Sequence, residues 1–243
     1  MAFTQAHEKI NVYSVHKCYL MWTLYTSTLD KENMEKIAKR STYRHGDLYR
    51  TLLEAAIELA RKGGKNAIVL REVTRQAGVA PNAAYRHFED LGSLLRAVSM
   101  AAQAQLADAM EKELATVKPS GNKAEDARAR LRAVGTGYLT FAQSEPGLFR
   151  MAFSEHADMS NATHPASTGH GGLTPFQILS GALDDLVSAG ELPAERRVAS
   201  EFLAWSAVHG LAMLLIDGPM RGSGQAQAEA LGQRLIDMME RGL

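Results

Sequence analysis

Apolar side chains recur at helical spacing soon after residue 47. Between residues 48 and 62 they fall on one face of an α-helix, and the glycine pair Gly63 and Gly64 predicts where that helix ends. A shorter helix is expected over about 70–77, where Leu70, Val73 and Ala77 share one face. The first part of the chain is therefore predicted to be helical.

A tight turn is predicted immediately after this second helix. Gly78 can adopt the left-handed backbone conformation that such a turn requires, and Val79 follows as an apolar contact. Pro81 suits the first turn of a third helix, expected over about 81–88. Two short helices that meet at a glycine are typical of a helix-turn-helix.

The rest of the chain repeats the helical pattern, and alternating strand patterns are absent from the sequence. We predict an all-α fold in which a three-helix bundle with a helix-turn-helix is joined by a long linker helix to a helical C-terminal domain. Loops are expected at 118–122 and 154–172. The further predicted helices span 93–116, 124–144, a short segment from 146, 174–189, 194–216 and 225–240.

Charge is distributed unevenly along the chain, although the formal net charge is zero. Residues 34–96 hold twelve Lys and Arg against seven Asp and Glu, whereas residues 97–243 hold twelve against seventeen. An excess of cations favours contact with phosphate groups. The basic block therefore indicates a nucleic-acid-binding part attached to a larger part without that role.

The first 33 residues lack the helical periodicity of the rest, and we expect 1–33 to be a disordered extension, with Met34 as an alternative start. A secretory signal is the competing interpretation, because Lys17 precedes the apolar stretch 18–25. No small-residue cleavage site follows that stretch. Residues 34–92 are expected to form a DNA-binding domain and residues 93–243 a ligand-binding and dimerisation domain.

Several kinds of chemistry find no support in the sequence. The single cysteine, Cys18, excludes an intrachain disulfide and favours a reducing compartment, so we expect a cytoplasmic protein. The apolar run 202–216 contains His209 and is too short to span a membrane, which favours a buried helix. No phosphate-binding loop, nucleophile motif or metalloprotease motif occurs, so no enzyme activity and no cofactor are expected.

An ordered motif connects these features to a known family. The turn Ala77, Gly78 and Val79 precedes a helix that ends in Tyr85 and Phe88, and the upstream helix has the matching apolar pattern. This arrangement, over about residues 44–98, resembles the helix-turn-helix of the tetracycline-repressor (TetR) family. The resemblance implies that the third helix enters the major groove of DNA.

The resemblance also implies roles for individual residues. Asn82 is expected to pair with adenine, and Ala80 and Ala83 to contact thymine methyl groups, while cationic neighbours contact phosphates. Taken singly, each of these residues is better explained as part of an ordinary solvated surface; their order within a basic block favours DNA binding. The residues expected to contact DNA are Arg40, Arg44, Arg71, Ala80, Pro81, Asn82, Ala83, Tyr85, Arg86 and His87.

A second, shorter motif lies in the C-terminal part. Trp205, His209 and Gly210 resemble the W-H-G signature of a subgroup of the same regulators. Because Trp205 and His209 are one helical turn apart, they face the same way, either as packed core or as ligand contacts. The bulky residues expected to face a ligand cavity are Phe141, Phe149, Met151, Phe176, Trp205 and His209.

These observations predict a transcriptional repressor that binds a near-palindromic double-stranded DNA operator as a homodimer and is released by an unknown small-molecule effector. A helical protein-interaction module without DNA binding is the alternative function. No membrane partner is expected. A metal site made by His156, His164 and His170 is disfavoured, because their spacing fits no compact zinc pattern.

Overall fold

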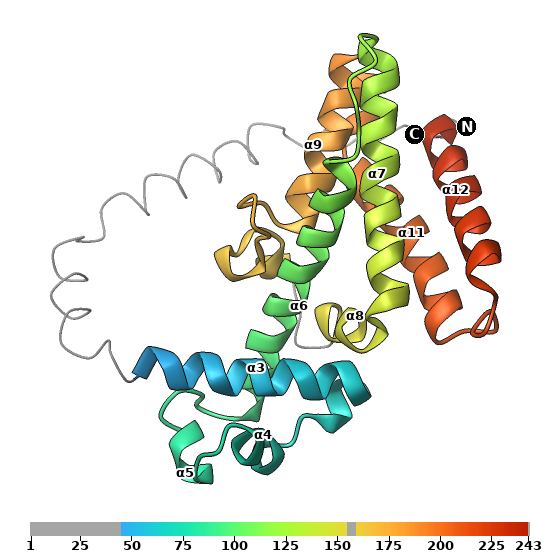
Figure 1. Cartoon of the computed structure of the whole chain (residues 1–243). Helices are drawn as coiled ribbons and strands as arrows, with labels where there is room; N and C mark the ends of the chain where they lie inside the picture. The colour runs from blue at the N-terminus through green and yellow to red at the C-terminus, as the bar shows by residue number, and fades with distance from the viewer. Residues whose placement is uncertain (1–44, 155–158, 243) are drawn as a thin grey trace, which may run out of the picture. The chain divides into compact units, whose positions relative to one another are not determined.

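The computed structural model describes residues 45–154 and 159–242, in which every regular element is a helix. Leu48–Leu243 form one compact unit. The prediction of an all-α fold is confirmed (Figure 1). The expectations for residues 1–33 lie outside the described residues.

Three helices form the N-terminal bundle: α3 (His45–Gly63), α4 (Leu70–Gln76) and α5 (Pro81–Ala84). A short 3-10 turn, η1 (Gly64–Ala67), follows α3. The predicted turn between α4 and α5 is present. Gly78 has a φ of 69° there, and the Val79 amide donates to the Thr74 carbonyl at 3.0 Å. The third helix is shorter than predicted, because regular α-helix ends at Ala84 and turn residues continue to His87.

The linker is α6 (Leu91–Leu114), which begins two residues earlier than predicted. Asp90 and Ser93 form a reciprocal capping box that stabilises its first turn. The chain then forms α7 (Lys123–Ser144) and the short α8 (Pro146–Ala152). Both pack against α6, so the linker is also one wall of the C-terminal domain.

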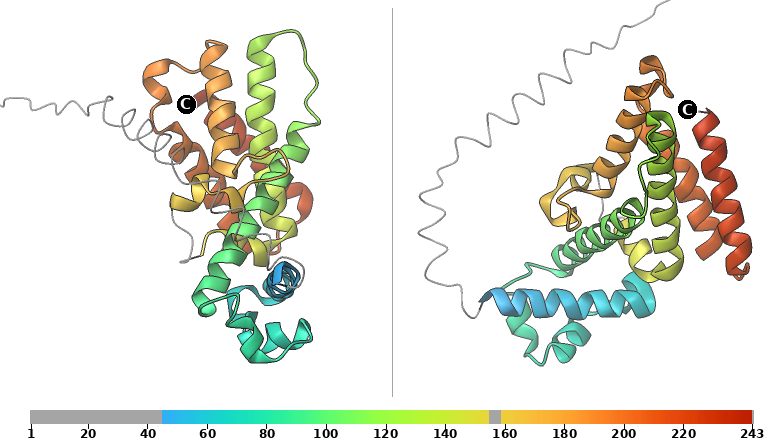
Figure 2. Two further views of the ribbon diagram at one scale, coloured as in Figure 1. Left: turned by 90° about the vertical axis from the view of Figure 1, so that its left-hand side faces the viewer. Right: turned by 45° about the horizontal axis from the view of Figure 1, so that its top comes forward.

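The C-terminal domain is completed by α9 (Pro175–Ser188), α10 (Ala194–Arg197), α11 (Ser200–Ile216) and α12 (Gln225–Gly242). Helix α7 contacts α6, α9, α11 and α12. The right-hand view of Figure 2 shows it between α6 and α9 on one side and α12 on the other. The segment before α9 contains two short turns, η2 (Met159–Thr163) and η3 (Pro165–Ser167). The loop expected there thus has local structure where it is described.

The prediction of one continuous helix over 194–216 is wrong. The helix is broken before Ser200, because Ala199 adopts a left-handed conformation with a φ of 62°. Arg197 holds the break in place with 2.7 Å hydrogen bonds to Asp184 on α9 and to Glu201 in the first turn of α11. Tertiary ion pairs therefore override the local helical preference here.

None of the helices in residues 45–154 and 159–242 is long and apolar enough to cross a membrane.

Candidate functional site

Helix α5 and the residues that follow it to Phe88 form what we call the α5 face, in which polar side chains are exposed and an apolar anchor is buried. Asn82 and Arg86 are exposed, and Tyr85 keeps 57% of its surface accessible. Ala84 and Phe88 are buried, and the Phe88 ring stacks on Tyr49 of α3 with centroids 4.9 Å apart. The anchor fixes which face of this short helix is accessible.

The start of α5 has the local chemistry that the sequence predicts. Pro81 occupies the first turn, where its missing N–H costs no hydrogen bond. Ala80 provides no side-chain cap, and the Ala83 amide instead donates to the Ala80 carbonyl at 2.9 Å. Arg71, at the start of the neighbouring α4, is also exposed.

Most of the predicted DNA-contacting residues that the structure describes are exposed, on α4, on α5 and in the turns beside α5. Two of them, Ala83 and His87, are half-buried. Arg40 and Arg44 lie outside the described residues. The exposed ones are Arg71, Ala80, Pro81, Asn82, Tyr85 and Arg86.

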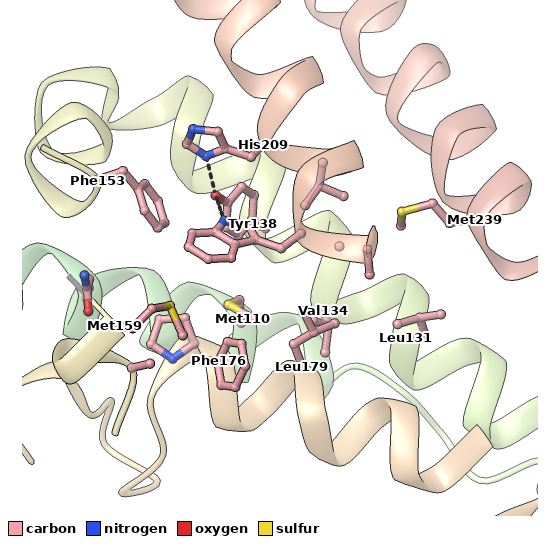
Figure 3. Close-up of a pocket in the computed structure, with 17 residues that line it drawn as sticks. Met110, Leu131, Val134, Tyr138, Phe153, Met159, Phe176, Leu179, His209 and Met239 are labelled. Carbon is pink, nitrogen blue, oxygen red and sulfur yellow. Dashed lines mark hydrogen bonds between the residues drawn. The ribbon is translucent and has the colours of Figure 1, made fainter. Parts of the chain in front are cut away.

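A cavity of about 410 Å³ lies within the C-terminal domain, between α6, α7, α9 and α11 (Figure 3). Where residues 45–154 and 159–242 line it, the cavity is apolar apart from a few uncharged or weakly basic side chains, and none of these residues is Asp, Glu, Lys or Arg. This composition is typical of a site for a small organic ligand. The lining residues are Gln103, Met110, Leu131, Val134, Gly135, Tyr138, Phe153, Met159, Ala162, Pro175, Phe176, Leu179, Ala204, Trp205, Val208, His209 and Met239.

Three aromatic side chains at this cavity are joined by hydrogen bonds. The Trp205 Nε1–H donates to the Tyr138 hydroxyl at 3.0 Å, and that hydroxyl lies 2.8 Å from His209 Nδ1 (Figure 3). Burial lowers the pKa of the His209 imidazole below its ordinary value of 6.5, and burial raises the pKa of the Tyr138 phenol. Both groups therefore remain uncharged at neutral pH.

The predicted ligand contacts divide into two sets. Phe176, Trp205 and His209 line the cavity, whereas Phe141, Phe149 and Met151 are buried and lie outside the lining. The Phe149 ring stacks on His209 with centroids 5.4 Å apart, so it supports the wall from behind. The size and apolar character of a residue do not show whether it lines a cavity or lies in the solid core.

Sequence reasoning missed two polar lining residues, Gln103 and Tyr138. Gln103 interrupts the alanine-rich stripe of α6, and a polar residue on an otherwise apolar face is a signal that was available. Tyr138 shares a face of α7 with Leu131 and Val134, and its spacing alone marks only core. Its role follows from the partners that the fold brings to it.

Helix α8 connects the cavity to the N-terminal bundle. A Cβ atom at Gly147 would lie 2.2 Å from the carbonyl oxygen of Ala60 on α3, so only glycine permits this approach. Arg61 of α3 reaches Glu145 at 3.0 Å, and Arg150 of α8 forms two-pronged hydrogen bonds with Asp217 after α11. The element that supports the cavity wall thus directly touches α3.

Two regions of the chain match known sequence families. A family described as "Bacterial regulatory proteins, tetR family" matches residues 52–98, and "Tetracyclin repressor-like, C-terminal domain" matches residues 131–239. The chain belongs to the TetR family. It is therefore a DNA-binding transcription regulator with a ligand-binding domain, and members of this family are non-enzymatic.

Solved structures share the TetR fold at low sequence identity. A protein of unknown function from Rhodococcus sp. RHA1 is 24% identical, with 84% of this chain and 99% of that chain covered and a TM-score of 0.63. FadR from Bacillus subtilis in complex with stearoyl-CoA is 16% identical over 80% and 99%, with a TM-score of 0.59. A TetR variant from Acinetobacter baumannii in complex with minocycline is 18% identical over 79% and 94%, with a TM-score of 0.55.

The loop histidines of this TetR-family chain are spread apart where they are described. His170 bonds Asp108 of α6 through both its backbone amide and Nδ1, each at 2.7 Å, and His164 caps the η3 turn. His156 lies outside the described residues. Within residues 45–154 and 159–242, no group of three or more His, Cys, Asp or Glu side chains is placed to hold a metal ion.

Proposed function

We propose that this protein is a homodimeric repressor that binds a near-palindromic operator and is released when a small molecule occupies the α6–α7–α9–α11 cavity. The observation that carries the proposal is the accessible face of α5, with Asn82 and Arg86 exposed above a buried Ala84 and Phe88 anchor. A helix held in this way can enter a major groove without unfolding its own core.

The side chains of this face divide into base-reading and phosphate-binding groups. Asn82 carries an amide that can form paired hydrogen bonds with adenine, and Ala83 offers a methyl group to thymine. Arg71 and Arg86 supply positive charge for the backbone of DNA, which sets the position of α5 but carries no sequence information.

The outer faces of α11 and α12 support the dimer. Leu203 of α11 is 66% exposed and Met238 of α12 is 60% exposed. Leu214 lies about three turns beyond Leu203 on the same side of α11. Gly210, between the two leucines, has no neighbour within 4 Å of its built Cβ position. An apolar helix pair of this kind is stable in water when a second copy covers it.

The cavity and the DNA-binding helices communicate through α6 and α8 in this proposal. Gln103 of α6 lines the cavity and donates a 2.9 Å hydrogen bond to the Ala152 carbonyl of α8. A ligand that contacts Gln103 and Phe153 therefore acts on both elements that reach the N-terminal bundle. The solved relatives with stearoyl-CoA and minocycline support small-molecule binding by this fold.

Selection of bound DNA from a random pool tests the proposal. The full-length protein is expected to enrich a sequence with two inverted half-sites about 34–36 Å apart or a multiple of that repeat. The Asn82→Ala variant is expected to relax the selection at one base pair in each half-site, while an Arg75→Ala control keeps the same sequence. A pool without an enriched inverted repeat would contradict the proposal.

A further inference from the structure

Residues 159–173, which contain the turns η2 and η3, lie at the boundary between the cavity and solvent. We call this segment the lid. Met159 and Ala162, both in η2, line the cavity. Met159 also keeps 50% of its surface accessible, so its side chain borders the cavity and solvent at the same time. The lid is therefore part of the wall that separates the two.

The end of the lid nearest α9 is fastened to the linker helix α6 by backbone hydrogen bonds. The amide of His170 donates to the Asp108 carboxylate at 2.7 Å, and the amide of Gly171 donates to the Glu111 carboxylate at 2.9 Å. The two carboxylates are three positions apart on α6 and so share one side of that helix. The exposed His170 ring adds a contact to Asp108 through Nδ1. Two successive amides of the lid are thus held by two charged acceptors.

This attachment depends on the glycines on either side of His170. A Cβ atom at Gly169 would lie 2.8 Å from Oδ1 of Asp108, and one at Gly171 would lie 2.7 Å from Oε1 of Glu111. Any larger residue would push the carboxylates away from the amides. Glycine therefore allows the backbone to come as close to α6 as the two hydrogen bonds require.

A further hydrogen bond closes the lid on itself. The Thr174 hydroxyl donates to the Ala162 carbonyl, and η2 and η3 contact each other. A compact loop whose ends meet in this way packs on itself and moves as one unit. Thr174 is also the N-cap of α9, where it forms a reciprocal capping box with Gln177. Release of the lid from α6 therefore turns it about Thr174 and carries Ala162 away from the cavity.

We propose that the lid controls the passage of small molecules between solvent and the cavity, and that its release from Asp108 and Glu111 is the opening step. The proposal rests on the proposed function only in that the molecule which passes is then the effector. A ligand enters and leaves through the same opening, so the stability of the closed lid sets both rates and leaves their ratio, the Kd, nearly unchanged.

Reaction of a thiol in the cavity wall measures this opening without a ligand. Val134 of α7 lines the cavity and is buried. Val134→Cys is combined with Cys18→Ser, so that the protein has a single thiol, and is treated with methyl methanethiosulfonate, a small uncharged thiol reagent. Asp108→Asn together with Glu111→Gln is expected to raise the reaction rate about tenfold or more, because hydrogen bonds to charged acceptors are lost.

Two control variants separate the attachment from general effects of charge. Glu113→Gln removes one negative charge from another side of α6 and is expected to leave the reaction rate unchanged. His170→Ala is expected to raise the rate about threefold at most, because the backbone amide keeps its bond to Asp108 and the lost ring contact is exposed. The rate is also expected to vary little with low concentrations of urea, since opening of the lid exposes little surface.

Hydrogen exchange provides a second measurement in proteins that retain Val134. The amides of residues 159–173 are expected to exchange faster in the Asp108→Asn and Glu111→Gln double variant, by the same factor as the thiol reacts faster. Equal factors mean that one motion of the lid exposes both its own amides and the cavity.

Three results would overturn the proposal: a double variant that reacts no faster than Glu113→Gln, faster exchange in the lid without faster thiol reaction, or a reaction rate that rises with urea as steeply as global unfolding does. None of these measurements uses DNA or an effector. A failed lid therefore leaves the repressor proposal standing, and a random pool without an enriched inverted repeat leaves the lid standing.

Discussion

Two regions of this protein expose side chains of opposite chemistry. Around α4 and α5 the accessible groups are cationic or amide-bearing, as at Arg71, Asn82 and Arg86. On α11 several exposed side chains are apolar, among them Phe202, Leu203 and Leu214, and Met238 is an exposed apolar side chain on α12. The first kind suits a polyanion and the second suits another protein surface, so exposure acquires a functional meaning only from the chemistry of what is exposed.

Beneath each exposed surface lie buried residues that hold its helix in place but are not themselves exposed. Ala84 and Phe88 anchor α5, while Val208 and Ala212 anchor α11 from its inner side. An exposed side chain can therefore be changed on one surface with little effect on the core beneath it. This separation lets single substitutions test each surface on its own.

The largest effect is expected from charge on the apolar surface. Leu203→Arg places a cation where a second copy would pack, and it is expected to convert the dimer to monomer. Operator affinity should then fall about 100-fold or more, because the two half-sites no longer bind as one unit. Sedimentation and DNA-binding titrations measure the two effects. Ser188→Arg, an exposed change on α9, is the control, and a dimer that survives Leu203→Arg would exclude this face as the interface.

A smaller effect is expected on the polar surface. Asn82→Ala is expected to cost about 1–3 kcal/mol of binding to the selected operator and to relax specificity at one position. Arg86→Ala is expected to weaken all sequences similarly and to reduce the salt slope by about one. Fluorescence anisotropy at several salt concentrations measures both quantities.

Arg75 provides the matched control for the polar surface. It lies on α4 and is exposed, but its guanidinium already donates to Glu72 at 2.8 Å. Arg75→Ala is therefore expected to change affinity and salt slope much less than Arg86→Ala. Equal effects of the two arginines would mean that general charge, rather than the α5 face, determines binding.

The contact between α8 and α3 joins the C-terminal domain to the N-terminal bundle. Gly147→Ala is expected to lower the free energy of unfolding by about 1–3 kcal/mol, because the added methyl group meets the Ala60 carbonyl. Gly181→Ala, in the open middle of α9, is expected to raise it by about 0.5–1 kcal/mol. Chemical denaturation compares them. Equal stability of both variants would show that α8 does not press on α3.

The smallest expected effect concerns two histidines with opposite pKa shifts. Burial lowers the pKa of His209 below 6.5, so the unfolded chain takes up a proton first and stability is lost as the pH falls from 6.5 toward the folded pKa. The Asp108 carboxylate raises the pKa of His170, whose contribution is present below 6.5 and lost as the pH rises through the folded value. His209→Gln should flatten the stability profile below pH 6.5, whereas His170→Gln should lower stability below pH 6.5 and remove the decline above it, as chemical denaturation at several pH values measures.

Much of the fold is predictable from local patterns. The helical period of the apolar residues predicts α3, α6, α7, α9 and α12, and Gly78 with Pro81 predicts the turn before α5. The break at Ala199 is not predictable in this way, because ion pairs from Arg197 to other elements hold it. Sequence patterns therefore predict a backbone conformation that is stabilised by neighbouring residues. They do not predict one that is stabilised by a residue distant in the chain.

The cavity shows the same limit for function. Phe149 and Phe176 have the same side chain and both lie on helices, yet one is a buried support and the other lines the cavity. Tyr138 has no distinguishing neighbour in the sequence, and its place between Trp205 and His209 arises only when α7 and α11 meet. A ligand site is a property of several elements, which one-dimensional spacing does not describe.

By itself the sequence determined the helical architecture, the helix-turn-helix and the basic character of the N-terminal part, since periodicity, turn residues and charge are properties of neighbouring positions. Only the tertiary structure decided which aromatic residues border an open volume, which nitrogen of His209 lies beside the Tyr138 hydroxyl and which helix faces are left uncovered. All three features depend on contacts between residues far apart in the chain. Which side chains are buried, and against which partners, is therefore fixed only when the helices pack together.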